Sequence, residues 1–132
     1  MAKFLLDSDI IIYFLKGKAA TVEEVIKHSA DDLVTSRINY TELLYGAYNS
    51  ARVESNLKTI TQFLDNFEIL EYTKEAAELF AKEKARLKKS GTIIADMDLM
   101  ISSICIANGL TLVTNNIKHF ERVKDLRIET WA

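Results

Sequence analysis

Short apolar runs alternate along the chain with longer stretches in which apolar positions recur every three or four residues. The runs have the length and composition of buried β-strands and lie at residues 3–6, 33–35, 68–72, 110–113 and 127–130. The longer stretches predict helices at residues 10–15, 22–28, 38–51, 57–67, 74–89 and 98–108. Strands that alternate with helices predict a parallel sheet covered by helices on both faces, because right-handed crossovers place the helices there.

The last two helical stretches predict different environments. Residues 74–89 carry apolar side chains on one face and end in Lys88 and Lys89, which is typical of a surface helix. Residues 98–108 are apolar on nearly all sides, so this helix should be buried between other elements. The predicted fold class is therefore α/β, a three-layer α/β/α domain around a central parallel sheet of about five strands.

The chain is expected to form a single domain over residues 1–132. It has 132 residues, no proline and only four glycines, so no linker or second domain is indicated. Apolar residues make up 48% of the chain, which is enough to fill a core and excludes intrinsic disorder.

Charge and cysteine content narrow the functional classes. The net charge of -2 excludes a general positive field for nucleic acid, so any such contact must be local. The one cysteine, Cys105, lies in an apolar stretch and cannot form an internal disulfide, as expected in a reducing cytoplasm. Asp7 and Asp9 interrupt the apolar start, and polar residues interrupt residues 99–117, so neither a signal peptide nor a membrane span is predicted.

Carboxylates follow the first two predicted strands. Asp7 comes directly after the first strand and Asp9 two residues later, at the sheet edge where α/β folds bind ligands. Either side chain could instead cap the helix that begins near Ile10. Glu42 lies in the helix after the second strand and has no cation three or four residues away, so both a solvated and a functional position stay open.

A second polar group occurs later in the chain. Asp96 and Asp98 stand at the start of the buried helix, where one carboxylate would suffice as a cap. Thr114, Asn115 and Asn116 follow the fourth strand, although asparagine also favours turns. All of these residues should reach the same end of one sheet as the first two acids. A shared acidic site for a hard divalent cation, Mg2+ or Mn2+, accounts for this better than independent caps.

Other chemistry is poorly supported by the sequence. His28 and His119 have no spacing to each other or to Cys105 that is typical of a zinc site. No GxxxxGK[ST] or GxGxxG loop is present, which argues against nucleotide-binding folds of those types. Of the two histidines, His119 is the better candidate for a substrate contact.

Three stretches together carry a resemblance to a known family, and they are FLLDSDIIIYFLKG, INYTELLYGA and ADMDLMISSICIANGLTLVTNNIKHFERV. In this order they resemble the opening strand with the first acid, the helix with the second acid, and the third acid with its buried helix and final strand, in PIN-domain ribonucleases of the VapC toxin type. The resemblance covers nearly the whole chain. The chain departs from the common pattern at Asp9, where the family often has asparagine, and at Asn116, where some members have aspartate.

The resemblance implies a metal-dependent RNA endonuclease whose cofactor is Mg2+ or Mn2+. It implies Asp7, Glu42 and Asp98 as catalytic metal ligands, Asp96 and Asn116 as residues that complete the metal site, and Thr114, Asp9 and Ser8 as supporting residues. In such a site, water attacks the phosphodiester and the 3' oxygen leaves, so the products carry a 5' phosphate and a 3' hydroxyl.

The resemblance also implies partners. The substrate would be transfer or ribosomal RNA, and a VapB-type antitoxin would lay its C-terminal segment across the acidic groove. The family forms homodimers that can join larger toxin–antitoxin assemblies, with no membrane contact. One helix carries more apolar surface than a single core face needs, which either an interface or core packing could use, at Tyr40, Leu43, Leu44, Tyr45 and Tyr48.

Two other classes stay open at this point. FLLDSD also fits a haloacid-dehalogenase-like phosphohydrolase with Asp7 as nucleophile and Asp9 as acid, although the lysine expected ahead of Asp96 is missing and Glu42 would have no role. A catalytically inactive PIN-like binding module is the non-enzymatic alternative. A response-regulator receiver is disfavoured, because its phosphoacceptor would follow the third strand, where this chain has Tyr72.

Overall fold

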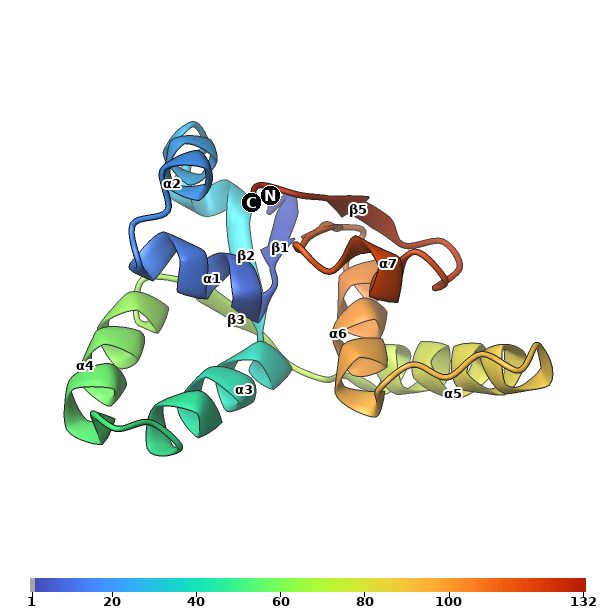
Figure 1. The fold of residues 1–132 in the computed structure, drawn as a ribbon. Coiled ribbons are helices and arrows are strands. Elements are labelled where there is room, and N and C mark those ends of the chain that lie inside the picture. Colours follow the sequence, from blue (N-terminus) through green and yellow to red (C-terminus); the bar gives the residue numbers. More distant parts are fainter. Residues whose placement is uncertain (1) are drawn as a thin grey trace.

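The computed structural model describes residues 2–132 and contains five parallel strands with helices around them (Figure 1). The strands are β1 (Phe4–Leu6), β2 (Leu33–Ser36), β3 (Glu68–Leu70), β4 (Thr111–Val113) and β5 (Arg127–Glu129). The helices are α1 (Ser8–Leu15), α2 (Ala19–Ile26), α3 (Arg37–Tyr48), α4 (Val53–Leu64), α5 (Lys74–Lys89), α6 (Asp96–Ala107) and α7 (Ile117–Phe120), and a 3-10 turn lies at η1 (Ala30–Asp32). The predicted parallel sheet is confirmed.

The strand order is β3-β2-β1-β4-β5, with every neighbouring pair parallel. The chain runs outward from β1 to β3 and then returns to the other side of β1 through β4. Leu5 of β1 therefore lies opposite Val34 of β2 and Leu112 of β4. The direction of winding reverses between β1 and β4, and the carboxyl ends of two such strands form the usual ligand crevice of an open α/β sheet.

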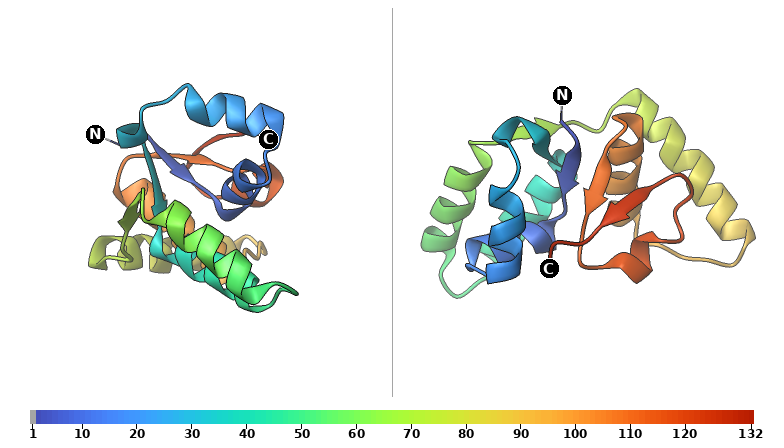
Figure 2. Two further views of the ribbon diagram at one scale, coloured as in Figure 1. Left: turned by 90° about the vertical axis from the view of Figure 1, so that its left-hand side faces the viewer. Right: turned by 90° about the horizontal axis from the view of Figure 1, so that it is seen from above.

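Helices cover both faces of the sheet, so the predicted three-layer architecture is confirmed (Figure 2). Successive strand residues point to opposite faces: Leu5 packs with residues of α5 and α6, and Leu6 with residues of α1, α3 and α4. Helix α6 is buried as predicted, and burial raises the pKa of Cys105 to about 12. No helix within residues 2–132 is long and apolar enough to span a membrane.

Local capping shifts several helix ends from their predicted positions. Helix α1 begins at Ser8 instead of residue 10, because the Asp7 side chain accepts the Ser8 N–H and ends the strand conformation there. Ser36 caps α3 in the same way through the Asn39 N–H. Helix α7 escaped prediction because four residues are too few to show a helical period.

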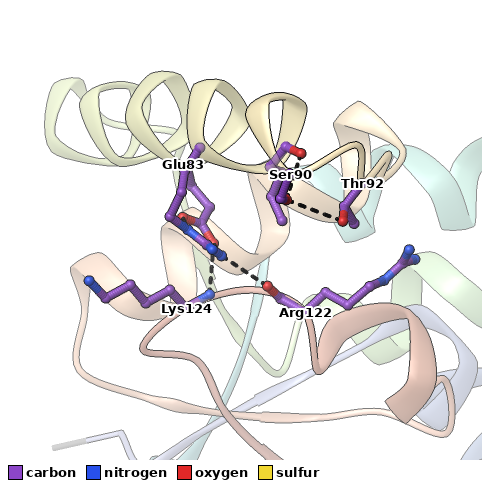
Figure 3. A network of polar contacts seen from close by, with 7 residues as sticks. Glu83, Ser90, Thr92, Arg122 and Lys124 are labelled. Atoms are coloured by element: carbon purple, nitrogen blue, oxygen red, sulfur yellow. Dashed lines mark hydrogen bonds and ion pairs between the residues drawn. The ribbon is translucent and has the colours of Figure 1, made fainter.

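A polar network joins α5 to the loop between α7 and β5 (Figure 3). The Glu83 carboxylate accepts two hydrogen bonds of 2.7 Å from Arg86 and one of 2.7 Å from the backbone N–H of Lys124. Arg86 Nη2 also donates to the carbonyl oxygen of Arg122 at 3.1 Å. Only 14% of the Glu83 side chain is exposed. This partly shielded carboxylate therefore fixes the loop that leads into the edge strand.

Replacing Glu83 with alanine should lower the free energy of unfolding by about 1–2 kcal/mol, because the Lys124 N–H and the Arg86 guanidinium lose their acceptor. The hydrogen bond from Arg86 lowers the pKa of Glu83 below its unfolded value of 4.5, so its contribution is present above pH 4.5 and fades as the pH falls through the folded pKa. Urea titrations at neutral and acidic pH would measure this difference. The exposed Glu78 of the same helix, changed to alanine, is the control; equal losses in the two variants would contradict the prediction.

The C-terminal segment is anchored by an aromatic cluster. Trp131 is 4% exposed and stacks on His28, with ring centroids 4.7 Å apart and an interplanar angle of 4°. Phe4 at the start of β1 meets the Trp131 ring at a steep angle, with a centroid distance of 5.0 Å. The C-terminal segment is thereby packed against the start of the first strand.

Candidate active site

The candidate site lies at the carboxyl ends of β1 and β4, where the sheet order reverses. The backbone N–H of Asp7 donates to the Val113 carbonyl at 2.9 Å, which aligns the two strand ends. Directly beyond them, the Thr114 hydroxyl donates to Asp7 Oδ2 at 2.8 Å. The fold thus joins two predicted site residues that are far apart in the sequence.

Asp7 is the most buried carboxylate of the site, at 7% exposure. Its Oδ1 accepts hydrogen bonds of 2.9 Å from the Ser8 N–H and from Asn39 Nδ2. Burial, and next the nearby charge of Asp9, raise the pKa of Asp7 to about 7. Capping is confirmed for Asp7, but the cap occupies only one of its two oxygens.

Asp9 is held with one oxygen satisfied and the other free. Its Oδ2 accepts the Asn115 N–H at 3.0 Å and faces the Thr114 hydroxyl at 3.4 Å. Its Oδ1 is buried and has no hydrogen-bond partner among residues 2–132. Burial raises the pKa of Asp9. A buried carboxylate oxygen without a donor is costly unless a proton or a cation approaches it.

Glu42 joins the same cluster from α3. Its Oε1 accepts a hydrogen bond of 2.8 Å from the Ser8 hydroxyl, which in turn accepts one of 3.0 Å from Asn39 Nδ2. Burial is the main cause that raises the pKa of Glu42, and the charges of Asp98 and Asp9 add to it. Glu42 is therefore not a solvated surface carboxylate. Ser8, which was predicted as a supporting residue, lies between Asp7 and Glu42 and contacts both.

The two acids of α6 have separate surroundings. Asp98 Oδ2 lies 3.1 Å from His119 Nδ1, and burial raises the pKa of Asp98. Asp96 is 61% exposed and forms an ion pair of 2.9 Å with Lys84 of α5. The expectation that one of them caps the helix is wrong, because the cap position is Ala95 and no side chain caps this end.

The predicted turn residues after β4 support the site mainly from outside it. The backbone N–H of Asn116 donates to Thr114 Oγ1 at 3.0 Å, and its amide nitrogen lies 2.9 Å from His119 Nδ1. Thr114 itself is fully buried and touches both Asp7 and Asp9. Thr114 thus organises the cluster, whereas Asn116 contacts it through neighbours.

Asn39 was missed from the sequence although it is central to the site. It is fully buried, its Oδ1 accepts the Ser36 hydroxyl at 2.6 Å, and its Nδ2 donates to Asp7 and Ser8. The available signal was its place in a helix interior, which asparagine disfavours, three residues before Glu42 on the same face.

The donor set fits a hard divalent cation. Asp7, Asp9, Glu42 and Asp98 all have a raised pKa, mainly from burial, so each carboxylate lacks sufficient positive charge around it. The buried Asp9 Oδ1 without a partner marks where such charge is missing. Within the described residues, no three His, Cys, Asp or Glu side chains are already arranged as a metal site. Carboxylates repel one another, so a cation would have to draw them together.

A groove of about 340 Å³ opens beside Glu42 between α1, α3 and α4. Apolar side chains form most of its wall, with one lysine at its side. Its lining includes Ile12, Leu15, Lys16, Leu43, Gly46 and Ile60. The groove therefore offers an apolar surface that ends at the carboxylate cluster.

Residues 4–126 match the PIN domain family. The "Ribonuclease VapC2" of Haemophilus influenzae is 37% identical over 132 residues, and the match covers all of both chains. The "tRNA(fMet)-specific endonuclease VapC" of Salmonella typhimurium is 35% identical over the same full length. Among solved structures, a DNA-bound VapBC complex from Salmonella typhimurium contains a chain that superposes with a TM-score of 0.93 at 35% identity, again with full coverage of both chains.

Proposed function

This chain belongs to the PIN domain family, among the VapC ribonucleases, and we propose that it hydrolyses RNA phosphodiester bonds as the toxin of a VapBC toxin–antitoxin pair. The observation that carries the proposal is the cluster of one buried and three partly buried carboxylates at the sheet reversal, in a chain similar over its full length to ribonucleases. The position of Glu42 in this cluster also gives it a role that a phosphohydrolase would leave unfilled.

We further propose that Asp7, Glu42 and Asp98 hold Mg2+ or Mn2+ and are the catalytic residues, with Asp9 Oδ1 at the same centre. When bound, the cation supplies positive charge for the scissile phosphate and makes water more acidic. Asp7 is pre-oriented for this role by three hydrogen bonds, from Ser8, Asn39 and Thr114.

Two predicted ligands have weaker support. The ion pair of Asp96 with Lys84 does not favour direct metal binding, and Asn116 contacts the centre only through Thr114 and His119. Both assignments stay predictions.

The test is cleavage of RNA by the purified, antitoxin-free protein in Mg2+ or Mn2+. Transfer RNA is the first substrate to try, because the Salmonella relative is named as a tRNA endonuclease. We expect discrete fragments with 5' phosphates and 3' hydroxyls, which disappear in EDTA and in the Asp98→Asn variant. Intact RNA from a folded protein that binds Mn2+ would instead favour the non-enzymatic binding module.

The groove beside Glu42 supports the antitoxin as the partner. An apolar peptide segment could fill it and extend over the carboxylates, which would block access to RNA. Solved structures of VapBC complexes with this fold show that such relatives pair with an antitoxin.

Replacing Gly46 with leucine tests this groove. Apart from neighbouring backbone of its own helix, no atom lies within 4 Å of a Cβ built at Gly46, so the new side chain can enter the groove without moving the backbone. Leucine also has a higher helix propensity than glycine, so thermal unfolding should not occur earlier. We expect antitoxin affinity, measured by calorimetry, to fall at least about 10-fold, which corresponds to about 1.4 kcal/mol. Unchanged affinity in a folded variant would place the antitoxin elsewhere.

We also propose the homodimer that the family implies. On α3, Tyr45 is 67% and Tyr48 is 64% exposed, so these two side chains are not used by the core and can serve an interface. Leu43 of the same helix is buried in the core.

A further inference from the structure

His119 is not one of the predicted metal-site residues, but it lies against Asp98, a carboxylate of the proposed metal site. Its Nδ1 is 3.1 Å from Asp98 Oδ2 and 2.9 Å from the amide nitrogen of Asn116. The histidine side chain is 30% exposed and the Asp98 side chain 20%, so the contact is partly shielded from water.

Asp98 depends on this contact more than the other acids depend on any one partner. Asp7 has three donors, and Asp9 has the Asn115 N–H and the Thr114 hydroxyl. In residues 2–132 the Asp98 carboxylate has one polar side-chain partner, which is His119 at ion-pair distance. The orientation of the Asp98 carboxylate is therefore set by one imidazole.

The chemistry of the two contacts fixes which atom donates. A single ring nitrogen cannot donate to a carboxylate and also accept an amide N–H. When Nδ1 carries a hydrogen and the Asn116 amide turns its oxygen toward the ring, that one N–H faces two acceptors: the Asn116 oxygen takes the hydrogen bond, and Asp98 Oδ2 lies at ion-pair distance. In that arrangement Asn116 orients His119, and His119 orients Asp98.

The backbone that carries His119 is firmly placed. The His119 N–H donates to the Asn116 carbonyl at 3.1 Å, which closes the first turn of α7. The next residue, Phe120, is 1% exposed and packs in the core cluster with residues of β1, β4 and α6. The imidazole can therefore hold Asp98 in place because its own helix is anchored.

We propose that His119 is a positioning residue that holds Asp98 through Nδ1 in the orientation required for cation binding. The inference rests on the proposed metal site and adds a residue outside the acidic set. Partners behind metal ligands commonly change metal affinity by about 10- to 100-fold when they are removed. The same range is expected here for Mn2+.

Three substitutions of His119 distinguish a role of Nδ1 from a role of Nε2. Asparagine at position 119 can place its amide nitrogen near the position of Nδ1, whereas glutamine reaches toward the position of Nε2, and alanine removes both. Mn2+ binding is measured by calorimetry on the protein without RNA, with wild type and Asp98→Asn as references. Circular dichroism and thermal unfolding verify that each variant is folded.

We expect His119→Ala to weaken Mn2+ binding about 10- to 100-fold, His119→Asn to restore most of the affinity, and His119→Gln to behave like alanine. RNA cleavage by the alanine variant should need more Mn2+ for half-maximal rate but approach the wild-type rate at saturation.

Equal Mn2+ affinity in wild type and His119→Ala would overturn the inference and leave the metal site intact. Rescue by glutamine instead of asparagine would also overturn it, because the imidazole would then act through Nε2. If wild type itself binds no Mn2+, the proposed metal site fails, which is a different result from either of these.

Discussion

Replacing Asp7 with asparagine is expected to abolish RNA cleavage and, at the same time, to make the metal-free protein more stable above pH 7. The loss of activity should exceed about 100-fold, because a proposed direct ligand is removed and even outer partners of metal ligands cost up to about 100-fold. The gain in stability is expected because burial of Asp7 disfavours its charged form, and asparagine has no charged form.

The sign of the stability effect comes from the pKa of Asp7. Burial and Asp9 raise it from 3.8 to about 7, so the folded protein binds this proton more tightly than the unfolded chain. Stability contributed by the protonated group is therefore full below pH 3.8 and is lost as the pH rises to about 7. Asparagine carries no charge at any pH, so the variant should gain on wild type across this range and stay ahead above it.

Asparagine can keep the local hydrogen bonds. Its oxygen can accept from the Ser8 N–H and from Asn39, and its amide group can donate to Thr114 Oγ1. Asparagine is also as good a helix cap as aspartate. The substitution therefore opens no new cavity and keeps the three contacts that hold the side chain.

The measurement is thermal unfolding in EDTA between pH 4 and pH 8, with Asp31→Asn as the control because Asp31 is exposed. Asp7→Asn should unfold at a higher temperature than wild type above pH 7, and the difference should vanish toward pH 4. Added Mg2+ should raise the midpoint of wild type and have little effect on the variant. A variant less stable than wild type at pH 8 would contradict the burial argument.

The second large effect is expected at the chain end, where Trp131→Ala should lower the free energy of unfolding by about 3–5 kcal/mol. The indole is 4% exposed, stacks on His28 and packs against Phe4, so its loss leaves a cavity beside β1 and uncovers one face of the His28 ring. Urea unfolding followed by circular dichroism measures the change. Trp131→Phe keeps an aromatic ring in the same place and should recover part of the loss. A cost below about 1 kcal/mol for alanine would show that the C-terminal segment is not anchored.

The sheet and the burial of α6 could be predicted because they depend on local patterns. Strand β1, for example, is a short apolar run that is followed directly by Asp7, and α6 is apolar on nearly all sides. Their neighbours in space then follow from the parallel, right-handed connections that such alternation requires. Helix ends were less accurate, because Asp7 and Ser36 cap their helices through side-chain contacts that a hydrophobic period does not contain.

The site was predicted in part for the same reason. Asp7, Asp9 and Thr114 were expected together, since all three follow strands and strand ends share one edge. The polar links from Asn39 depend on the tertiary fold, because α3 packs its first turns beside α1. The separation of Asp96 from Asp98 depends on which helix faces each carboxylate, and the sequence does not contain that information.

The buried position of Cys105 makes this protein convenient for single-site chemical labelling. It is the only cysteine in the chain, it is inaccessible to solvent, and burial raises the pKa of its thiol to about 12. The thiolate is the form that attacks maleimides and similar electrophiles, so the native thiol should stay unmodified in the folded state. A cysteine introduced on the exposed face of α5 could therefore carry a fluorophore or spin label without replacing Cys105, and the movement of RNA or antitoxin could be followed from one defined point.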